Sequence, residues 1–219
     1  MAPHRVQPVR IAARPKTRRR TPTLPTLAEV GRLRANARTE SDGGFIEWLA
    51  LTGPRPAEGF GLRWPNVDLT RGAEVVRIVE QVYRGEPVDT TKTPAGARDI
   101  IFCRRAADLL REQSAALLVD GRMDIDGPVF PSPLGHAWHA SNFNRRVWRP
   151  TCIAAGLRTL KPGTLRYVYK SYVGASGLPE SITMQMTGHD GDRTHRGYTR
   201  PVEGQAAMIR AALDEVFGA

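Results

Sequence analysis

The chain has 219 residues, 41% of them hydrophobic, so it is long enough to bury a substantial core. Cys103 and Cys152 are too few and too far apart for a disulfide framework or a thiolate metal site, and no apolar run approaches membrane-spanning length. We therefore expect a protein of the reducing cytoplasm, without membrane contact. The net charge of +10 favours an anionic partner such as nucleic acid, although a merely basic surface would give the same balance.

In chain order, residues 1–25 are rich in arginine and proline and hold hardly any bulky apolar residue. We expect a flexible basic arm there, either lying along phosphates or simply solvated. Order should begin at residue 26, because Thr26-Leu-Ala-Glu29 forms a capping box ahead of a helical pattern. A second helix is predicted over 42–51. Gly53-Pro54 then breaks the chain, and Pro56 suits the first residue of a short helix that carries Glu58.

Between residues 74 and 103 the pattern changes from helix to strand. Runs at 75–82, 87–93 and 98–102 are rich in β-branched residues and are separated by Gly85 and by Pro94-Ala-Gly96. The rest of the chain has helical periodicity, which predicts helices at 106–119, 142–155, 164–175, 179–186 and 204–217, the second of them bent at Pro150. We predict a mixed α/β fold that is predominantly α-helical, with a small three-stranded antiparallel sheet.

Residues suited to phosphodiester chemistry are spread along this framework: Arg55, Lys92, Arg166, His189 and Tyr198. A guanidinium can bind two oxygens of one phosphate, an imidazole can donate a hydrogen bond or a proton, and a phenol can be a covalent nucleophile. Taken singly, each also has a structural interpretation: the arginines in ion pairs, the lysine solvated, the histidine capping a helix and the tyrosine at the edge of the core.

Together these residues carry a family resemblance. The segment Thr52-Gly-Pro-Arg55-Pro-Ala-Glu58 resembles the first motif of the tyrosine recombinase, or phage integrase, family. Thr91-Lys92-Thr93 is similar to the hairpin that carries the family's lysine, and Leu165-Arg166 is similar to its second motif. Thr187-Gly-His189 resembles the third motif, and Tyr198 follows this histidine at the family's spacing of nine positions. The resemblance covers about residues 26–217.

The resemblance implies that residues 26–219 form a catalytic domain of the DNA breaking-rejoining type. It implies a site-specific recombinase or integrase of bacterial or phage origin, which cleaves and rejoins double-stranded DNA through a 3′-phosphotyrosyl intermediate and needs no cofactor or metal. The implied roles are a phosphate clamp from Arg55 and Arg166, a hydrogen bond from His189, proton donation to the leaving 5′-oxygen by Lys92, nucleophilic attack by Tyr198 and support from Glu58. In the family the segment after the tyrosine often docks on a neighbouring protomer, so the helix at 204–217 could mediate self-association on DNA or pack on its own domain.

The chain departs from the family pattern in two ways. The family usually has histidine where this chain has Gly163, three residues before Arg166, and another where it has Tyr167. The first histidine helps to accept the phenol's proton, so we expect slower strand cleavage. Residues 1–25 are also too short for the helical domain that family members carry on the N-terminal side, and we expect that domain to be absent from this chain. Either the chain is a fragment or a decayed copy, or its true start lies further upstream, or it works with only a basic arm. The alternatives are a catalytically impaired remnant and a non-enzymatic basic module that binds DNA or RNA.

A metal site is not predicted. His136 and His139 have a spacing that could place two imidazoles on one ion, but no acidic or sulfur partner stands close in sequence.

Overall fold

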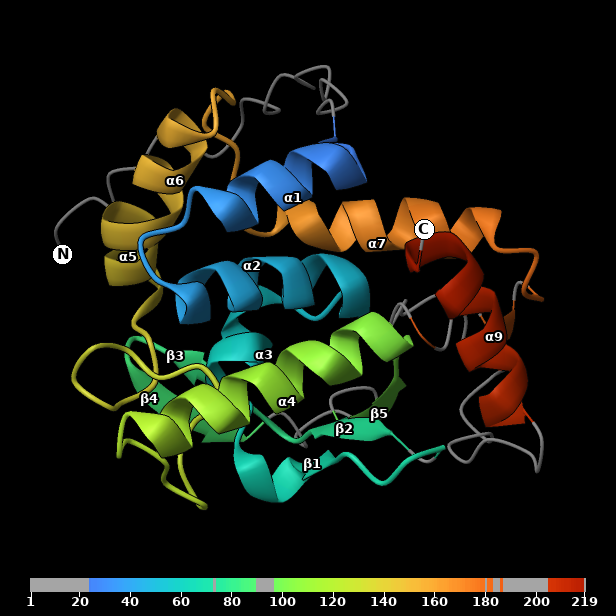
Figure 1. Cartoon of the computed structure of the whole chain (residues 1–219), viewed down its shortest axis with the longest axis horizontal. Coiled ribbons are helices and arrows are strands. Elements are labelled where there is room, and N and C mark those ends of the chain that lie inside the picture. The colour runs from blue at the N-terminus through green and yellow to red at the C-terminus, as the bar shows by residue number, and fades with distance from the viewer. Residues whose placement is uncertain are drawn as a thin grey trace, which may run out of the picture.

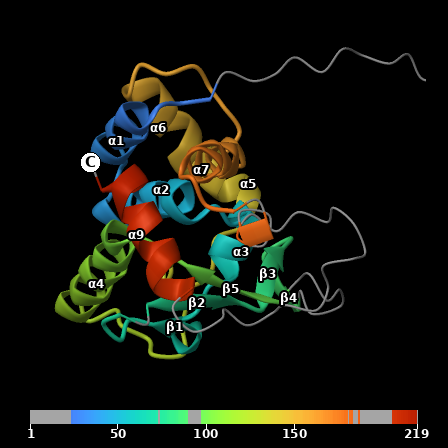
Figure 2. The same cartoon turned by 90° about the vertical axis from the view of Figure 1, so that its right-hand side faces the viewer.

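The computed structural model describes residues 24–72, 74–89, 97–179, 181–182, 186 and 205–218 (Figures 1 and 2). Its longer elements are helices α1 (Leu27–Ala35), α2 (Glu40–Thr52), α3 (Pro56–Gly61), α4 (Arg104–Val119), α5 (Ala140–Phe143), α6 (Arg149–Ala154), α7 (Thr164–Ala175) and α9 (Gln205–Phe217). The strands are β1 (Val67–Asp68), β2 (Val75–Ile78), β3 (Glu80–Tyr83), β4 (Glu86–Asp89) and β5 (Arg98–Ile101). This confirms the predicted fold class, predominantly helical with a small antiparallel sheet.

The first helices begin and end where local chemistry predicts. Thr26 and Glu29 form the expected capping box, with the Glu29 amide donating to Thr26 Oγ1 at 3.2 Å and the Thr26 amide to Glu29 Oε2 at 2.9 Å. Helix α2 ends at Gly53, whose φ of 70° lies in the left-handed region that favours glycine. Because this turn is tight, α3 starts immediately afterwards, with Pro56 in its first turn.

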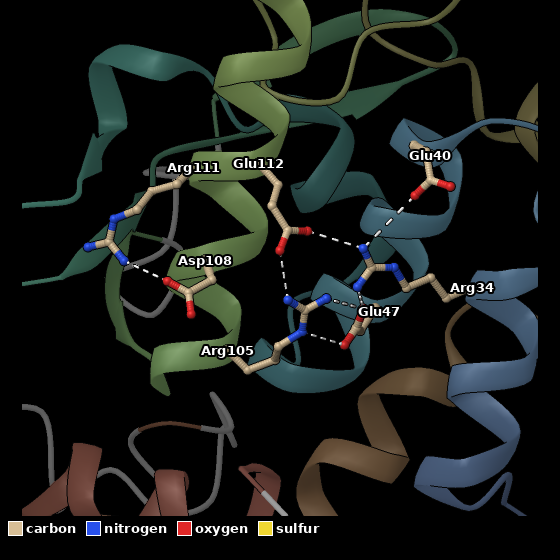
Figure 3. A network of polar contacts seen from close by, with 7 residues as sticks. All are labelled: Arg34, Glu40, Glu47, Arg105, Asp108, Arg111 and Glu112. Atoms are coloured by element: carbon tan, nitrogen blue, oxygen red, sulfur yellow. Dashed lines mark hydrogen bonds and ion pairs between the residues drawn. The ribbon is translucent and has the colours of Figure 1, made fainter.

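Helix α2 is the centre of the hydrophobic core, and other elements pack around it. Phe45 of α2 lies 5.2 Å from Phe60 of α3 and 5.3 Å from Phe143 of α5, between ring centroids. On the outer side, ion pairs link α1, α2 and α4 (Figure 3). There Glu47 of α2 accepts from both Arg34 of α1 and Arg105 of α4. These contacts fix α2 as the scaffold from which the neighbouring loop, Gly53–Arg55, extends.

The strand region differs in detail from the prediction. The run expected as one strand over 75–82 is divided at Val79 into β2 and β3. β2 pairs antiparallel with β1 and β5, Val76 facing Ile100, to form the three-stranded sheet, whereas β3 pairs only with β4. The division has a packing reason: Gly61 of α3 lies so close to the Glu80 backbone that a Cβ there would stand 2.9 Å from the Glu80 carbonyl oxygen. β3 thus leaves the sheet to pack on α3.

The helix predicted over 142–155 is also interrupted, around the residue that the sequence identified. A five-residue π-helical segment, Asn144–Trp148, separates α5 from α6, and Pro150 stands in the first turn of α6. Proline has no amide hydrogen for the carbonyl four residues earlier, and a wider turn accommodates that loss. His139 caps α5 through its ring, accepting from the Ser141 amide at 3.2 Å. Within the described ranges no cluster of metal-ligating side chains is found.

The C-terminal helix α9 packs on its own chain, in contact with α4, α7 and β5. Ile209 and Leu213 are buried, Phe217 stacks on Tyr169 of α7, and Asp214 accepts a hydrogen bond of 2.6 Å from the Arg104 amide at the start of α4. The sequence left open whether this helix packs on its own domain or on a neighbour, and here it is an integral part of the core. In the part of the chain described, no helix has the length and apolar character needed to cross a membrane.

Candidate anion-binding and catalytic site

The candidate site lies where the C-terminal end of α2, the start of α3, β5 and the first turns of α7 meet. Figure 2 looks along α7 and shows it end-on above α3. Arg55 is the residue immediately before α3, and its side chain is 57% exposed. Glu58, one turn into α3, has a side chain only 3% exposed. The sequence placed both residues on one short helix, and the structure brings the guanidinium of Arg55 against the carboxylate of Glu58 at 2.9 Å.

Glu58 is held by hydrogen bonds from two arginines. Its Oε1 accepts from Arg55 Nη1 at 2.9 Å and from Arg98 Nη1 at 3.2 Å. Its Oε2 accepts from the Arg55 backbone amide at 2.7 Å and from Arg98 Nη2 at 2.8 Å. Burial alone would raise the pKa of Glu58, but the hydrogen bonds and charge of Arg98, with those of Arg55, outweigh it and lower the pKa to about 2. Glu58 is therefore an ionised support at neutral pH.

Arg166 stands in the first turn of α7, and its side chain extends to the loop between α2 and α3. Its Nη1 donates to the carbonyl oxygen of Gly53 at 2.6 Å, at the C-terminal end of α2 where helical carbonyls lack intrahelical partners. Gly53 is required there for a second reason, because a Cβ would collide with the ring of Tyr169. Burial, and then the neighbouring charge of Arg98, lower the pKa of Arg166. The two arginines of the predicted phosphate clamp are thus anchored to one short loop.

Two further cations belong to this cluster, and sequence reasoning gave neither a role. Arg98 opens β5, and the available signal was an arginine that follows the predicted hairpin and directly precedes Asp99 and two buried isoleucines. Lys170 stands four residues after Arg166, so the two share a face of α7. Burial, and then the charges of Arg166 and Arg55, lower the pKa of Lys170. Its ammonium lies 6.0 Å from the centre of the Tyr167 ring, toward the N-terminal end of the helix.

The cluster is rich in basic side chains. Four of these five residues are cations, namely Arg55, Arg98, Arg166 and Lys170, and Glu58 is the carboxylate among them. Arg55 is the most exposed of these five residues, and its guanidinium is a planar donor that matches the geometry of a phosphate. The arrangement is suited to binding an anion at the surface beside α3 and α7.

Other predicted site residues are not placed. Lys92, His189 and Tyr198 lie outside the described residues, as do residues 1–23 of the expected arm. Gly163 is placed: it precedes α7 with an ordinary helical φ of −61°, and a Cβ built there meets nothing within 4 Å. Tyr167, where the family resemblance implies another histidine, is 55% exposed. The structure therefore unites Arg55, Glu58 and Arg166 but leaves the nucleophile and its two helpers as predictions.

Comparison with known proteins finds similar chains among the tyrosine recombinases. No protein-family model matches the chain. Over 201 residues it is 26% identical to the tyrosine recombinase XerD of Neisseria meningitidis serogroup B, a match covering 88% of this chain and 63% of that protein. The XerD of a serogroup A strain is 25% identical, with the same coverage. The chain thus spans less than two thirds of the length of these relatives.

Solved structures of low sequence identity share the fold. The crystal structure of XerA recombinase superposes with a TM-score of 0.58 at 19% identity, over 94% of this chain and 66% of that one. The Tn1549 transposon integrase in complex with a circular intermediate DNA gives 0.66 at 13% identity, over 90% and 63% of the two chains. The integrase from mycobacterium phage Brujita gives 0.65 at 16% identity, over 95% and 62%. In sequence this chain is similar to the XerD tyrosine recombinases, and it shares the fold of the XerA recombinase, the Tn1549 integrase and the Brujita integrase.

Proposed function

We propose that this chain is the catalytic domain of a site-specific DNA recombinase or integrase that breaks and rejoins double-stranded DNA through a 3′-phosphotyrosyl intermediate. The observation that carries the proposal is the joint anchoring of Arg55 and Arg166 around Gly53, with Glu58 buried beneath them. Arg166 is bonded to the loop that carries Arg55. Burial, then the charge of Arg98 and also that of Arg55 lower the pKa of Arg166, so the two guanidinium groups can address the non-bridging oxygens of one phosphodiester. The description of the Tn1549 integrase in complex with DNA supports DNA as the partner.

In the proposed reaction the phenol of Tyr198 loses its proton to water, because Gly163 has no side-chain base to accept it. The phenol oxygen attacks phosphorus in line and forms a new P–O bond as the bond to the 5′-oxygen breaks. Lys92 gives its proton to that leaving oxygen. The charge of the five-coordinate transition state lies on the non-bridging oxygens, where Arg55, Arg166 and His189 donate to it. Rejoining reverses these steps with another 5′-hydroxyl, so the bond energy is kept in the protein–DNA linkage.

The test is covalent capture of DNA by the full chain. A library of nicked duplexes of random sequence is incubated with the protein, which is then denatured, and the DNA that stays attached is sequenced. Wild type should retain DNA through a linkage lost in Tyr198→Phe, while both proteins should bind intact duplex with the same affinity. Attachment that survives in Tyr198→Phe, or its complete lack in wild type, would rule out the tyrosine mechanism.

A second candidate function is DNA binding with little or no cleavage, and Gly163 is the observation that favours it. A phenol has an ordinary pKa near 10, and the loss of a general base typically slows a reaction by about 10²–10⁴-fold. This candidate predicts affinity for DNA without covalent capture. The same experiment therefore separates the two.

We also propose that α9 mediates self-association on DNA by occupying, on a neighbouring copy, the surface that it covers here on its own chain. The contacts of Asp214, Arg210 and Phe217 are specific enough to serve in either arrangement. Sedimentation of the protein alone and on its captured DNA tests this, since only the DNA complex should contain more than one copy. A single copy on DNA at all protein concentrations would contradict it.

A further inference from the structure

We infer that Arg98 is a positioning residue of this site: it holds Glu58 so that Arg55 is both fixed in place and left with positive charge for an incoming phosphate. The inference rests on the proposed function, because that function supplies the DNA phosphate that Arg55 would bind. Its structural basis is the bidentate pair between Arg98 and Glu58, with N–O distances of 2.8 and 3.2 Å, formed across 40 positions of sequence.

The two arginines that donate to Glu58 differ in burial, and this difference indicates different roles. The side chain of Arg98 is 12% exposed, whereas that of Arg55 is 57% exposed. Arg98 therefore lies on the inner side of the carboxylate and Arg55 on the outer side. A group as enclosed as Arg98 is poorly placed to contact a DNA backbone directly, so its influence on the anion passes through Glu58 and Arg55.

The charge balance explains why a second arginine is needed. If Glu58 faced Arg55 alone, the pair would be neutral, and an incoming anion would compete with the carboxylate for the same guanidinium. Because Arg98 also donates to both carboxylate oxygens, the three groups together keep one positive charge. Arg55 retains its hydrogen bonds to Glu58, which fix its orientation, and still attracts a phosphate.

The fork geometry of arginine matters as much as its charge. Two parallel N–H bonds hold the plane of the Glu58 carboxylate, which also accepts from the Arg55 amide at the start of α3. A lysine at position 98 would supply the charge but only a point contact. A displacement of about 1 Å at a reacting group can lower a rate by about 10²-fold. Arg98→Lys is therefore informative because it keeps charge and loses geometry.

The experiment compares Arg98→Met, Arg98→Lys and a matched control, Arg77→Met, in the full chain. Arg77 is an exposed arginine of the adjacent strand β2 that pairs with Asp99 and not with Glu58. Because neighbouring side chains of a strand point to opposite faces, Arg77→Met removes the same charge from the face of β5 away from Arg98. Two readouts need no DNA cleavage: sulfate affinity at pH 7 from the NMR signals of the arginine side chains, and the titration of the Glu58 carboxyl by carbon NMR. Covalent DNA capture is the third.

Arg98→Met should lower sulfate affinity and DNA capture by about 10- to 100-fold and move the Glu58 titration upward by about one to three pH units. Arg98→Lys should lie between it and wild type, and Arg77→Met should match wild type. An Arg98→Met protein that folds and keeps the wild-type titration and sulfate affinity would overturn the inference. If Arg98→Met does not fold, the result for Arg98→Lys decides. A wild-type Glu58 titration and a wild-type sulfate affinity in Arg98→Lys would then overturn the inference.

A second pair of variants tests whether Arg98 acts through Glu58. The loss of sulfate affinity caused by Arg98→Met is measured once with Glu58 present and once with Glu58→Gln. The loss should be several-fold smaller in the Glu58→Gln protein. An equal loss in both backgrounds would mean that Arg98 acts on its own, against the inference. Failure of the proposed function looks different: wild type would then form no covalent DNA adduct, while the titration and sulfate results would still stand.

Discussion

At the scale of single residues, Glu58 contributes both to the site and to stability. Its folded-state pKa of about 2 lies below the ordinary value of 4.5, so its contribution to stability is complete above pH 4.5 and is lost as pH falls toward 2. We expect Glu58→Gln to lower the free energy of unfolding at pH 7 by roughly 3 kcal/mol, because it leaves Arg98 buried without its counter-charge.

Denaturant unfolding between pH 2 and 7 checks this expectation. The difference between wild type and Glu58→Gln should be constant above about pH 5 and shrink below it. Glu86→Gln, a change on the exposed strand β4, is the matched control and should follow wild type throughout. A difference that stays the same down to pH 2 would show that the Glu58 carboxylate is not specially stabilised.

Gly163 is the second residue whose effect can be isolated. A side chain there meets no atom within 4 Å and the backbone is in an ordinary conformation, so Gly163→His should fold. The imidazole would stand one turn before Arg166, at the position where the family resemblance implies a proton acceptor for the phenol. We expect covalent capture of nicked DNA to rise by about 10-fold or more. Gly163→Ala adds a side chain without a base and should leave capture unchanged; equal capture by all three proteins would contradict the idea.

At the scale of elements, α7 presents Arg166 and Lys170 on one face toward the loop that carries Arg55. If that face meets a DNA phosphate, Lys170→Ala should weaken duplex binding at every salt concentration. It should also reduce the slope of log affinity against log salt by about 0.9, the value for one lost phosphate contact. Arg122→Ala, at an exposed position beyond α4, removes equal charge. Fluorescence anisotropy at salt concentrations of roughly 50 to 200 mM measures the affinity and its salt dependence for each protein. If Lys170→Ala and wild type have the same slope, the assignment of a phosphate contact to Lys170 is contradicted.

At the scale of the whole molecule, α9 joins the end of the chain to the start of α4 and to α7. Asp214 caps α4, and the loss of such a cap lowers stability by about 0.5–2 kcal/mol. We therefore expect Asp214→Ala to lower the free energy of unfolding by about 1 kcal/mol and to speed hydrogen exchange in both α9 and the first turn of α4. Its neighbour Glu215 is exposed on the same helix, and Glu215→Ala should change neither; faster exchange in both variants alike would argue against the cap.

The docking of α9 also connects this helix to the candidate site. Phe217 stacks on Tyr169, with ring centroids 5.9 Å apart, and Tyr169 packs against Gly53, whose carbonyl holds Arg166. The same buried contacts that fix the chain end therefore support the loop between α2 and α3. Self-association through α9 would have to preserve these contacts in the neighbouring copy, which is a geometric requirement on any such assembly.

The features that depend on near neighbours could be predicted from the sequence alone. The Thr26 capping box, the stop at Gly53-Pro54, the first helical residue Pro56 and the interruption near Pro150 follow from backbone chemistry within a few residues, and the structure has each of them. The order and spacing of Arg55, Arg166 and the later motifs were enough to indicate the family. Lys92, His189 and Tyr198 stay predictions of that kind.

Contacts between residues far apart in sequence could not be predicted and became visible in the folded chain. Local periodicity gives each strand and helix but not which side chains meet, so the pair between Glu58 and Arg98 was not foreseen. The same holds for the division of the 75–82 run at Val79, which results from packing of Gly61 against β3, and for the placement of α9 on its own domain. Burial then sets the electrostatics: the pKa of Glu58 is low because two arginines converge on an enclosed carboxylate, and that convergence exists only in the folded chain.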